Sequence, residues 1–208
     1  MKYIDLSHTF TSSMPVYPGN PKSQLKQVAF IGKDECTLFE VKTSMHIGTH
    51  VDAPSHMLEN GKGLHEYPIE HFFGNGVLID ARGKETIDVE LLGRKQILKE
   101  DIVFILTGFS SKFKEAEYYQ SYPVITEEFA KKIVANGVKM IGTDTPSPDK
   151  APYLIHKILL KVDVLIIENL ANLEALLPYP QFDVIALPIK FDAEASPIRV
   201  VAQISQSI

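Results

Sequence analysis

The 208-residue sequence contains no tryptophan and a single cysteine, Cys36. One cysteine cannot form an intramolecular disulfide, which suits a reducing compartment, and we expect Cys36 to be a small, partly buried apolar side chain. The N-terminus lacks the uninterrupted apolar stretch of a signal peptide, and no segment approaches the roughly 18 apolar residues of a membrane span. We therefore expect a cytoplasmic protein that does not associate with membranes.

Positive charge is also limited and dispersed. The 21 lysines and arginines are outnumbered by 26 acidic residues, which gives a formal net charge of -5. Nucleic-acid-binding proteins concentrate positive charge on one face, so we expect no nucleic-acid partner. The chain is 45% hydrophobic, which is enough to bury a sizeable core. Because we find no internal repeat, low-complexity tract or linker, we expect a single domain spanning residues 1–208.

Short apolar runs alternate with amphipathic stretches along the chain. The clearest helix is predicted over 127–135, with Thr126 as its N-cap, acids in its first turn and Asn136-Gly137 at its end. Two more helices are predicted over 89–98 and 152–161, the second opening with a proline whose missing N–H costs little there. Runs rich in apolar and β-branched residues predict strands at 3–6, 25–31, 38–43, 76–81, 102–107, 139–143, 162–167, 184–188 and 198–203. This order indicates an α/β fold.

One segment concentrates residues that carry chemistry, namely His46, His50, Asp52 and His56. Imidazole nitrogen and carboxylate oxygen are ligands that zinc prefers. The four-residue step from His46 to His50 can place both rings on one face of a helical turn, whereas the step of two to Asp52 suits an extended segment. We therefore expect the chain to change conformation near Gly48, because glycine tolerates strained backbone angles.

Two further candidates lie in the C-terminal part of the sequence. His156 falls inside the amphipathic stretch 153–160, and Glu168 follows the apolar run 164–167. A glutamate is seldom buried unless it is paired or bound to a cation, and strand ends are common sites in α/β folds. The sequence leaves two alternatives open, because His156 can also be a core histidine and Glu168 an exposed acid. We expect structural roles for the remaining histidines, His8, His65 and His71.

Several segments together resemble a known family. The most specific is a long pattern of the form HxGTHxDxPxH over 46–56, and the likeness continues through 4–8, 14–19, 142–147, 196–199 and the pair His156 and Glu168. On these residues the chain is identified as a member of the cyclase-like family of metal-dependent hydrolases, whose best-understood branch is the bacterial kynurenine formamidases. The resemblance implies a swivelling β/β/α fold, with helices against a mixed sheet, assembled as a homodimer or homotetramer.

The resemblance also implies a role for each site residue. One divalent metal would be held by His46, His50 and Asp52. A second would be held by Asp52, His156 and Glu168. Zinc is the expected metal and manganese the alternative. His56 falls where the family has its general acid/base, a role that suits an imidazole with an ordinary pKa near about 6.5. The implied reaction is hydrolysis of an amide or formamide C–N bond by a metal-activated hydroxide.

The sequence departs from the formamidase branch at the residue that would contact substrate. Tyr17 occupies the position of a tryptophan that helps those enzymes to hold an aromatic substrate. Tyr17 keeps an aromatic face, so a small aromatic substrate similar to N-formylkynurenine is expected, with cyclic amides such as isatin as the alternative. The loop 143–148 can line the pocket or simply follow a strand. Its candidate substrate-binding residues are Asp144, Thr145 and Ser147.

Two other classes of protein fit part of the pattern. A non-haem iron oxygenase could use His50, Asp52 and His156 as a site of two histidines and one carboxylate. That assignment leaves His46, His56 and Glu168 without a role. A non-catalytic metal-binding protein would not require His56, which ligates no metal in the implied arrangement. A metal-dependent hydrolase therefore accounts for the largest number of these residues.

Overall fold

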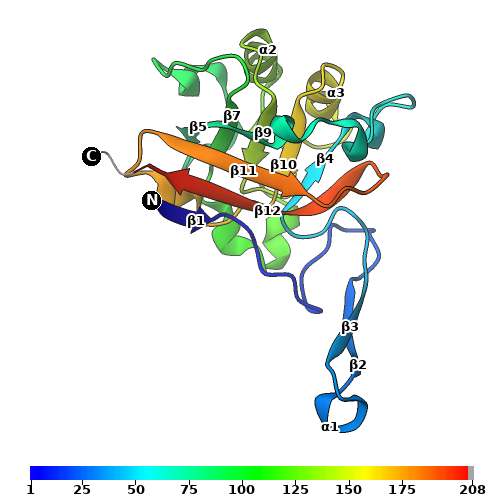
Figure 1. The fold of residues 1–208 in the computed structure, drawn as a ribbon. Helices are drawn as coiled ribbons and strands as arrows, with labels where there is room; N and C mark the ends of the chain where they lie inside the picture. The colour runs from blue at the N-terminus through cyan, green and yellow to red at the C-terminus, as the bar shows by residue number, and fades with distance from the viewer. Residues whose placement is uncertain (206–208) are drawn as a thin grey trace.

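Strands make up most of the regular structure of residues 1–205, the part of the chain that the computed structural model describes (Figure 1). The strands are β1 Lys2–Asp5, β2 Gln24–Ala29, β3 Leu38–Lys42, β4 His50–Asp52, β5 Phe73–Asp80, β6 Thr86–Ile87, β7 Ile102–Leu106, β8 Val124–Ile125, β9 Met140–Thr143, β10 Leu165–Glu168, β11 Phe182–Pro188 and β12 Ala195–Ile204. The α-helices are α1 Ile31–Asp34, α2 Glu127–Ala135 and α3 Leu154–Leu160. Short 3-10 helices are η1 Pro54–His56, η2 Leu64–Glu66, η3 Ile69–Phe72, η4 Val89–Leu92, η5 Phe109–Lys112, η6 Ala116–Tyr119 and η7 Leu173–Leu176.

Seven of these strands close into a barrel. They follow the order β12-β11-β5-β7-β9-β10-β4, and β4 also pairs with β12, which completes the ring. β5, β7, β9 and β10 are parallel to one another, whereas the pairs that involve β4, β11 and β12 are antiparallel. β1 extends the sheet beside the C-terminal part of β12. Closure leaves a barrel with almost no free strand edge.

The barrel is packed on both sides of its wall. In β7, Ile102, Phe104 and Leu106 belong to one buried apolar cluster with residues of β11 and β12. Val103 and Ile105 belong to a second cluster, together with residues of α2 and α3, and these helices cover the barrel on the same side (Figure 1). A strand that is buried on both faces is apolar throughout, which explains why its sequence predicts it well.

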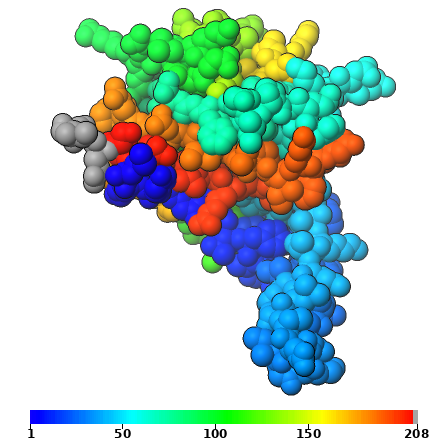
Figure 2. Space-filling model, in the orientation of Figure 1, coloured from blue at the N-terminus to red at the C-terminus, as the bar shows by residue number. Residues whose placement is uncertain are grey.

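A hairpin projects away from the barrel. Strands β2 and β3 pair with each other and with no other strand of residues 1–205, and α1 lies at the tip of the projection (Figure 2). The exposed apolar side chains of this arm are Phe30, Ile31, Leu38, Phe39 and Val41. An isolated two-stranded hairpin is only marginally stable in water. The arm therefore carries an apolar surface that its own chain leaves uncovered.

The predicted elements are largely confirmed. Each predicted strand overlaps an observed one, and α2 begins after Thr126, whose hydroxyl accepts a hydrogen bond from the Phe129 N–H as expected of an N-cap. The helix predicted over 89–98 is wrong beyond η4, because the chain turns away at Gly93, where φ is 52°. The helix predicted over 152–161 begins later, at Leu154, after Tyr153 in a left-handed conformation. The sequence did not reveal α1, β6 or β8. β4 was not among the predicted strands, although the step from His50 to Asp52 indicated the extended segment that is found there.

The fold prediction is confirmed only at its coarser level. The fold is α/β, with a sheet of mixed direction and helices against it, as expected. The correction is that the sheet closes into a barrel with few helices, and this closure depends on pairing of β4 with β12, which hydrophobic periodicity cannot reveal. Cys36 is exposed, not partly buried, because it lies in the arm. No helix in residues 1–205 is long and apolar enough to cross a membrane.

Candidate metal centre

Strand β4 places two predicted ligands in the barrel wall. His50 and Asp52 are two residues apart in a strand, so their side chains point to the same face. β4 lies between β10 and β12, and its antiparallel register sets His50 directly opposite Glu168. Topology therefore brings together residues that are far apart in the sequence.

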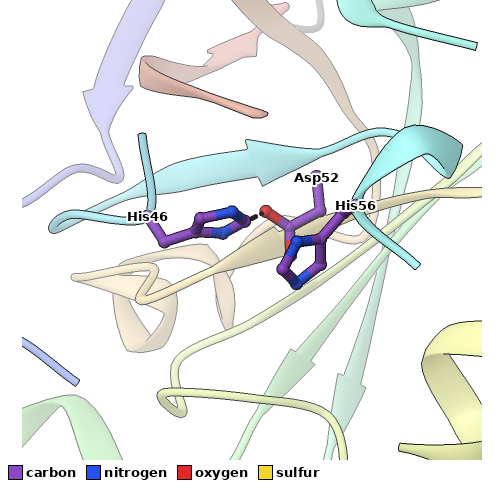
Figure 3. Close-up of side chains that lie close together, drawn as sticks. All are labelled: His46, Asp52 and His56. Carbon is purple, nitrogen blue, oxygen red and sulfur yellow. Dashed lines mark ion pairs between the residues drawn. The ribbon is translucent and has the colours of Figure 1, made fainter. Parts of the chain in front are cut away.

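The chain turns sharply just before β4, at Gly48. Its φ is 55°, and a Cβ at this position would lie 2.8 Å from the side chain of Met14. The predicted change of conformation at Gly48 is confirmed, although the segment between His46 and His50 forms bends and no helical turn. After β4, the short helix η1 brings His56 back beside His46, with the two rings 4.1 Å apart (Figure 3).

Helix α3 and strand β10 contribute the other predicted ligands. Glu168 ends β10, and its Oε2 lies 3.2 Å from Nε2 of His50. His156 lies near the start of α3, with Nε2 at 3.3 Å from Oε1 of Glu168 and 3.8 Å from Oδ2 of Asp52. His156 and Glu168 thus lie beside the histidines of residues 46–56. Glu168 is 6% exposed, so the alternative of an exposed strand-end acid is wrong, whereas the metal-binding role of His156 remains a prediction.

The centre of this cluster is withdrawn from solvent but poorly paired. Asp52 is completely buried, and His50 is 2% exposed. Both carboxylate oxygens of Asp52 and Nε2 of His50 are buried without a hydrogen-bond partner. Imidazole nitrogens of His46 and His50 lie 3.0 Å and 3.6 Å from Asp52 Oδ1. Unpaired buried polar atoms are costly, so this donor set of nitrogen and oxygen atoms fits a divalent cation.

The charges in the cluster strongly affect one another. Burial lowers the pKa of His50, but Asp52 and Glu168 outweigh this effect and raise the pKa to about 9. Burial also lowers the pKa of His156, whereas Asp149 and Glu168 raise it to about 10. Burial raises the pKa of Asp52, yet the neighbouring histidines hold it well below its usual range. The two carboxylates Asp52 and Glu168 thus favour positive charge at this centre, as a cation-binding site requires.

Two sets of ligand atoms are close enough together to hold an ion. His46, Asp52 and His56 form one, and His50, Asp52 and Glu168 form the other, so Asp52 belongs to both. In each set the ligand atoms lie within 4.8 Å of one another. Figure 3 shows the first set converging, with His46 and His56 on either side of the Asp52 carboxylate. The division of the ligands between two ions remains a prediction.

A cavity of about 460 Å³ opens onto this cluster. Its walls include His46, His50, His56, His156 and Glu168. Two of the predicted substrate-binding residues, Tyr17 and Ser147, also line it. The ring of Tyr17 meets that of Tyr119 edge to face, with 5.7 Å between the centroids. The cavity therefore has a polar floor of candidate metal ligands and partly aromatic walls.

Asp144 and Thr145, the other two predicted substrate-binding residues, lie behind the cavity wall. Both are completely buried. Asp144 accepts hydrogen bonds from the backbone N–H groups of Thr107 and Gly108. The hydroxyl of Thr145 donates to the carbonyl of Ser147, at 2.8 Å. These residues hold the loop in shape, and the structure gives them no direct contact with the cavity.

Sequence reasoning missed two acids beside the cluster. Asp149 accepts from the ring of His156, with 2.6 Å between Oδ1 and Nδ1. Glu194 lies in the segment before β12, and its Oε1 is 3.4 Å from Nε2 of His46. The only sequence signal for Asp149 is its place shortly before a helix, where an acid can cap free N–H groups. Glu194 gave no comparable signal.

The remaining histidines lie outside both sets of metal ligands. His8 stacks on Phe113, with 3.6 Å between ring centroids, and burial lowers its pKa to about 4, assisted by Lys114. His71 packs against Tyr67 with 4.8 Å between centroids. His65 faces Asp192 at 3.3 Å. These packing contacts agree with the expected structural roles.

Comparison with known proteins agrees with this picture. The sequence model of the Cyclase family matches residues 4–150. The kynurenine formamidase of Salinibacter ruber is 27% identical over 97% of this chain and 97% of its own length. A solved structure described as a potential metal-dependent hydrolase with cyclase activity has a TM-score of 0.82 at 25% identity, covering 97% of this chain and 96% of that one. Isatin hydrolase A from Labrenzia aggregata, bound to benzyl benzoate, has a TM-score of 0.86 at 24% identity, covering 97% and 93%, which shows a shared fold.

Proposed function

Because this chain belongs to the Cyclase family, we propose that it is a hydrolase that cleaves an amide or formamide C–N bond in a small aromatic substrate. The observation that carries the proposal is the buried, unpaired set of ligand atoms around Asp52 at the floor of a cavity. The likeness to a kynurenine formamidase supports an aryl formamide as the substrate class. What the proposal adds to family membership is the bond that is cleaved and the class of substrate.

The metal would be held by residues of β4 and β10, together with His46 from the bend before β4 and His156 from α3. We assign one ion to His46, His50 and Asp52. We assign a second to Asp52, His156 and Glu168. Zinc suits this mixture of imidazole and carboxylate ligands, and manganese is the alternative. A bound divalent cation supplies Lewis acidity, which polarises a carbonyl oxygen and makes water acidic enough to act as a nucleophile near neutral pH.

His56 is the proposed general acid/base. Its ring borders the cavity beside His46. Burial lowers the pKa of His56, and Asp52 only partly opposes that effect. The imidazole is therefore neutral near pH 7, which lets it accept a proton from water and then donate that proton to the departing amine.

The aromatic walls suit a flat substrate. Tyr17, Tyr119 and Tyr153 all line the cavity, and phenol rings offer apolar faces together with hydroxyl groups that form hydrogen bonds. A volume of about 460 Å³ falls within the usual range for sites that enclose a small molecule. We place the aromatic ring of the substrate among these tyrosines, with its amide group towards His56.

One observation favours the alternative of a cyclic amide of the isatin type. Within residues 1–205, no lysine or arginine side chain lines the cavity. A substrate without a carboxylate needs no such partner, and isatin is uncharged. The structural likeness to isatin hydrolase A is consistent with this alternative.

Metal analysis of the purified protein, followed by hydrolysis assays, tests the proposal. N-formylkynurenine, formanilide and isatin are each offered to the zinc-loaded protein, and the chelator-treated protein is the control. We expect stoichiometric metal and hydrolysis of at least one of these compounds that stops on chelation. Bound metal without hydrolysis of any of them would refute the proposed bond and substrate class and leave the family assignment intact, and absence of metal binding would refute the metal centre itself.

We also propose a homodimer or homotetramer. The support is the arm, whose strands β2 and β3 expose Phe39 and Val41 although a lone hairpin gains little stability by itself. Light scattering coupled to size-exclusion chromatography measures the mass directly. A monomer at micromolar concentration would contradict the proposal.

A further inference from the structure

Asp149 is a buried aspartate that the sequence did not reveal, and it is hydrogen-bonded to the candidate ligand His156. Asp149 is 5% exposed and lies in the loop between β9 and α3. Its Oδ1 is 2.6 Å from Nδ1 of His156, and its Oδ2 accepts from the backbone N–H of Ile155 at 2.6 Å and of His156 at 3.3 Å. One carboxylate thus binds both the imidazole ring and the start of the helix that carries it.

The position of Asp149 is itself fixed. Its backbone carbonyl accepts a hydrogen bond from the hydroxyl of Tyr122, at 2.9 Å, and Tyr122 is buried. Its backbone N–H points to Oγ of Ser147, at 3.5 Å, and Ser147 lines the cavity. The backbone of Asp149 is therefore held by contacts that do not involve His156.

The hydrogen bond determines which nitrogen of His156 faces the cluster. An ionised carboxylate only accepts hydrogen bonds, so Nδ1 of His156 must carry a proton when it contacts Asp149. Nε2 is then the nitrogen left to bind a cation, and it is the one that lies 3.3 Å from Glu168 and 3.8 Å from Asp52. An outer partner of this kind orients a ligating histidine and increases its basicity.

We propose that Asp149 is a positioning residue for the metal centre: it fixes the Nδ1–H tautomer of His156 and anchors that ring to the first turn of α3. This inference rests on the metal centre proposed above and does not depend on which bond is hydrolysed. A residue that served only to cap α3 would need one oxygen for the backbone N–H groups. The second oxygen of Asp149 is committed to the imidazole.

Asp149→Asn separates the capping of the α3 N–H groups from the positioning of the His156 ring. The asparagine side chain has a single acceptor oxygen, which can still cap the N–H groups of Ile155 and His156, but its amide NH₂ then faces Nδ1 of His156. Because that group donates, it favours the tautomer with the proton on Nε2, the wrong one for metal binding. We therefore expect Asp149→Asn to weaken zinc binding by about 10- to 100-fold, as is typical when an outer-shell partner is lost.

Asp101→Asn is the matched control. Asp101 is 3% exposed, and its Oδ2 accepts from the backbone N–H of Leu98 at 2.7 Å. It is thus another buried aspartate that accepts a backbone hydrogen bond, outside the cavity wall and both sets of metal ligands. Zinc affinity is measured by competition with a chromophoric chelator for the wild type and both variants, with thermal unfolding of the metal-free proteins as the check on folding. We expect Asp101→Asn to bind zinc as the wild type does.

A second measurement uses only the wild type. In zinc-loaded protein with ¹⁵N-labelled histidine, NMR should show a protonated Nδ1 and a metal-bound Nε2 for His156. A deprotonated Nδ1, or zinc affinity that falls no further in Asp149→Asn than in Asp101→Asn, overturns the inference and leaves the metal centre intact. A wild type that binds no zinc overturns both, whereas weaker zinc binding in Asp149→Asn supports the inference even if no test compound is hydrolysed.

Discussion

The candidate metal centre has two halves that are held in place differently. In the buried half, the imidazole rings are fixed by hydrogen bonds at Nδ1: His50 donates to the carbonyl of Gly48 at 2.8 Å, and His156 contacts Asp149 at 2.6 Å. In the cavity half, His46 and His56 lie against each other, with 4.1 Å between centroids and 40° between the ring planes, and they border the cavity.

This difference separates two tasks. Rings fixed at Nδ1 present Nε2 in one orientation, as a metal site requires. A ring at the cavity wall can reach both substrate and water, as proton transfer requires. Asp52 lies between the halves and contacts His46, His50 and His156. We therefore expect the buried half to hold metal more firmly, and the cavity half to combine the proposed ligand His46 with the proposed proton carrier His56.

The largest effect is expected from Asp52→Asn, because this carboxylate belongs to both halves. The substitution keeps the size of the side chain but removes the charge that several histidines share. We expect loss of stoichiometric metal, measured by plasma mass spectrometry, and hydrolysis reduced to background. Glu194→Gln is the control, since Glu194 is 40% exposed in its side chain and contacts only His46 of the centre. Full metal content in Asp52→Asn would show that the two halves do not share a ligand.

His56→Ala tests whether the cavity half transfers protons. We expect unchanged metal content and a kcat reduced by about 10²- to 10⁴-fold, the usual contribution of general acid/base catalysis. Because burial lowers the pKa of His56, wild-type activity should be high at neutral pH and decline only as the pH falls through that lowered value. The decline should be absent from the residual activity of the variant. Loss of metal in His56→Ala would instead indicate that His56 is a metal ligand, together with His46 and Asp52.

His156→Ala and His46→Ala compare the two halves directly. His156 is 3% exposed in its side chain and tied to Asp149, whereas His46 is 18% exposed. We expect His156→Ala to weaken zinc binding by more than the roughly 10- to 100-fold expected for an outer-shell change. We expect His46→Ala to weaken zinc binding less than His156→Ala does. Chelator competition on the two variants gives the ratio. Equal losses of zinc affinity would contradict the division into a buried half and a cavity half.

The two halves also differed in how well the sequence predicted them. His46, His50, Asp52 and His56 occupy one short segment, so their spacing indicates a site without knowledge of the fold. Glu168 joins them only because β4 pairs with β10 in a register that sets it opposite His50. That pairing is long-range, and only the family resemblance could anticipate it.

The strands and helices show the same dependence on local signals. β7 was predicted because burial on both faces leaves a continuous apolar run. β4 was not predicted as a strand, because it has three residues and two of them are polar ligands. Asp149 was missed because its role depends on hydrogen bonds to Ile155 and His156, and these form only once the loop is folded.

The smallest effect is expected at the turn that joins the two halves. Gly48 has a φ of 55° and lies against Met14, whereas Gly83 has a φ of 73° and open space around its Cα. Alanine at either position adopts a strained left-handed backbone, a cost of about 1–3 kcal/mol in unfolding free energy. Gly48→Ala must also displace the buried Met14, which packs with Phe113 and Tyr118. We expect urea denaturation to show the greater loss for Gly48→Ala.

Zinc affinity in the same two variants decides what this turn contributes. The carbonyl of Gly48 accepts from Nδ1 of His50, so a shift of the turn should reorient a ligand of the buried half and weaken zinc binding in Gly48→Ala but not in Gly83→Ala. If both variants bind zinc as the wild type does, the orientation of His50 is set by its place in β4 and not by the turn. The buried half would then owe its rigidity to the barrel, and the segment from His46 to Gly48 would belong wholly to the cavity side.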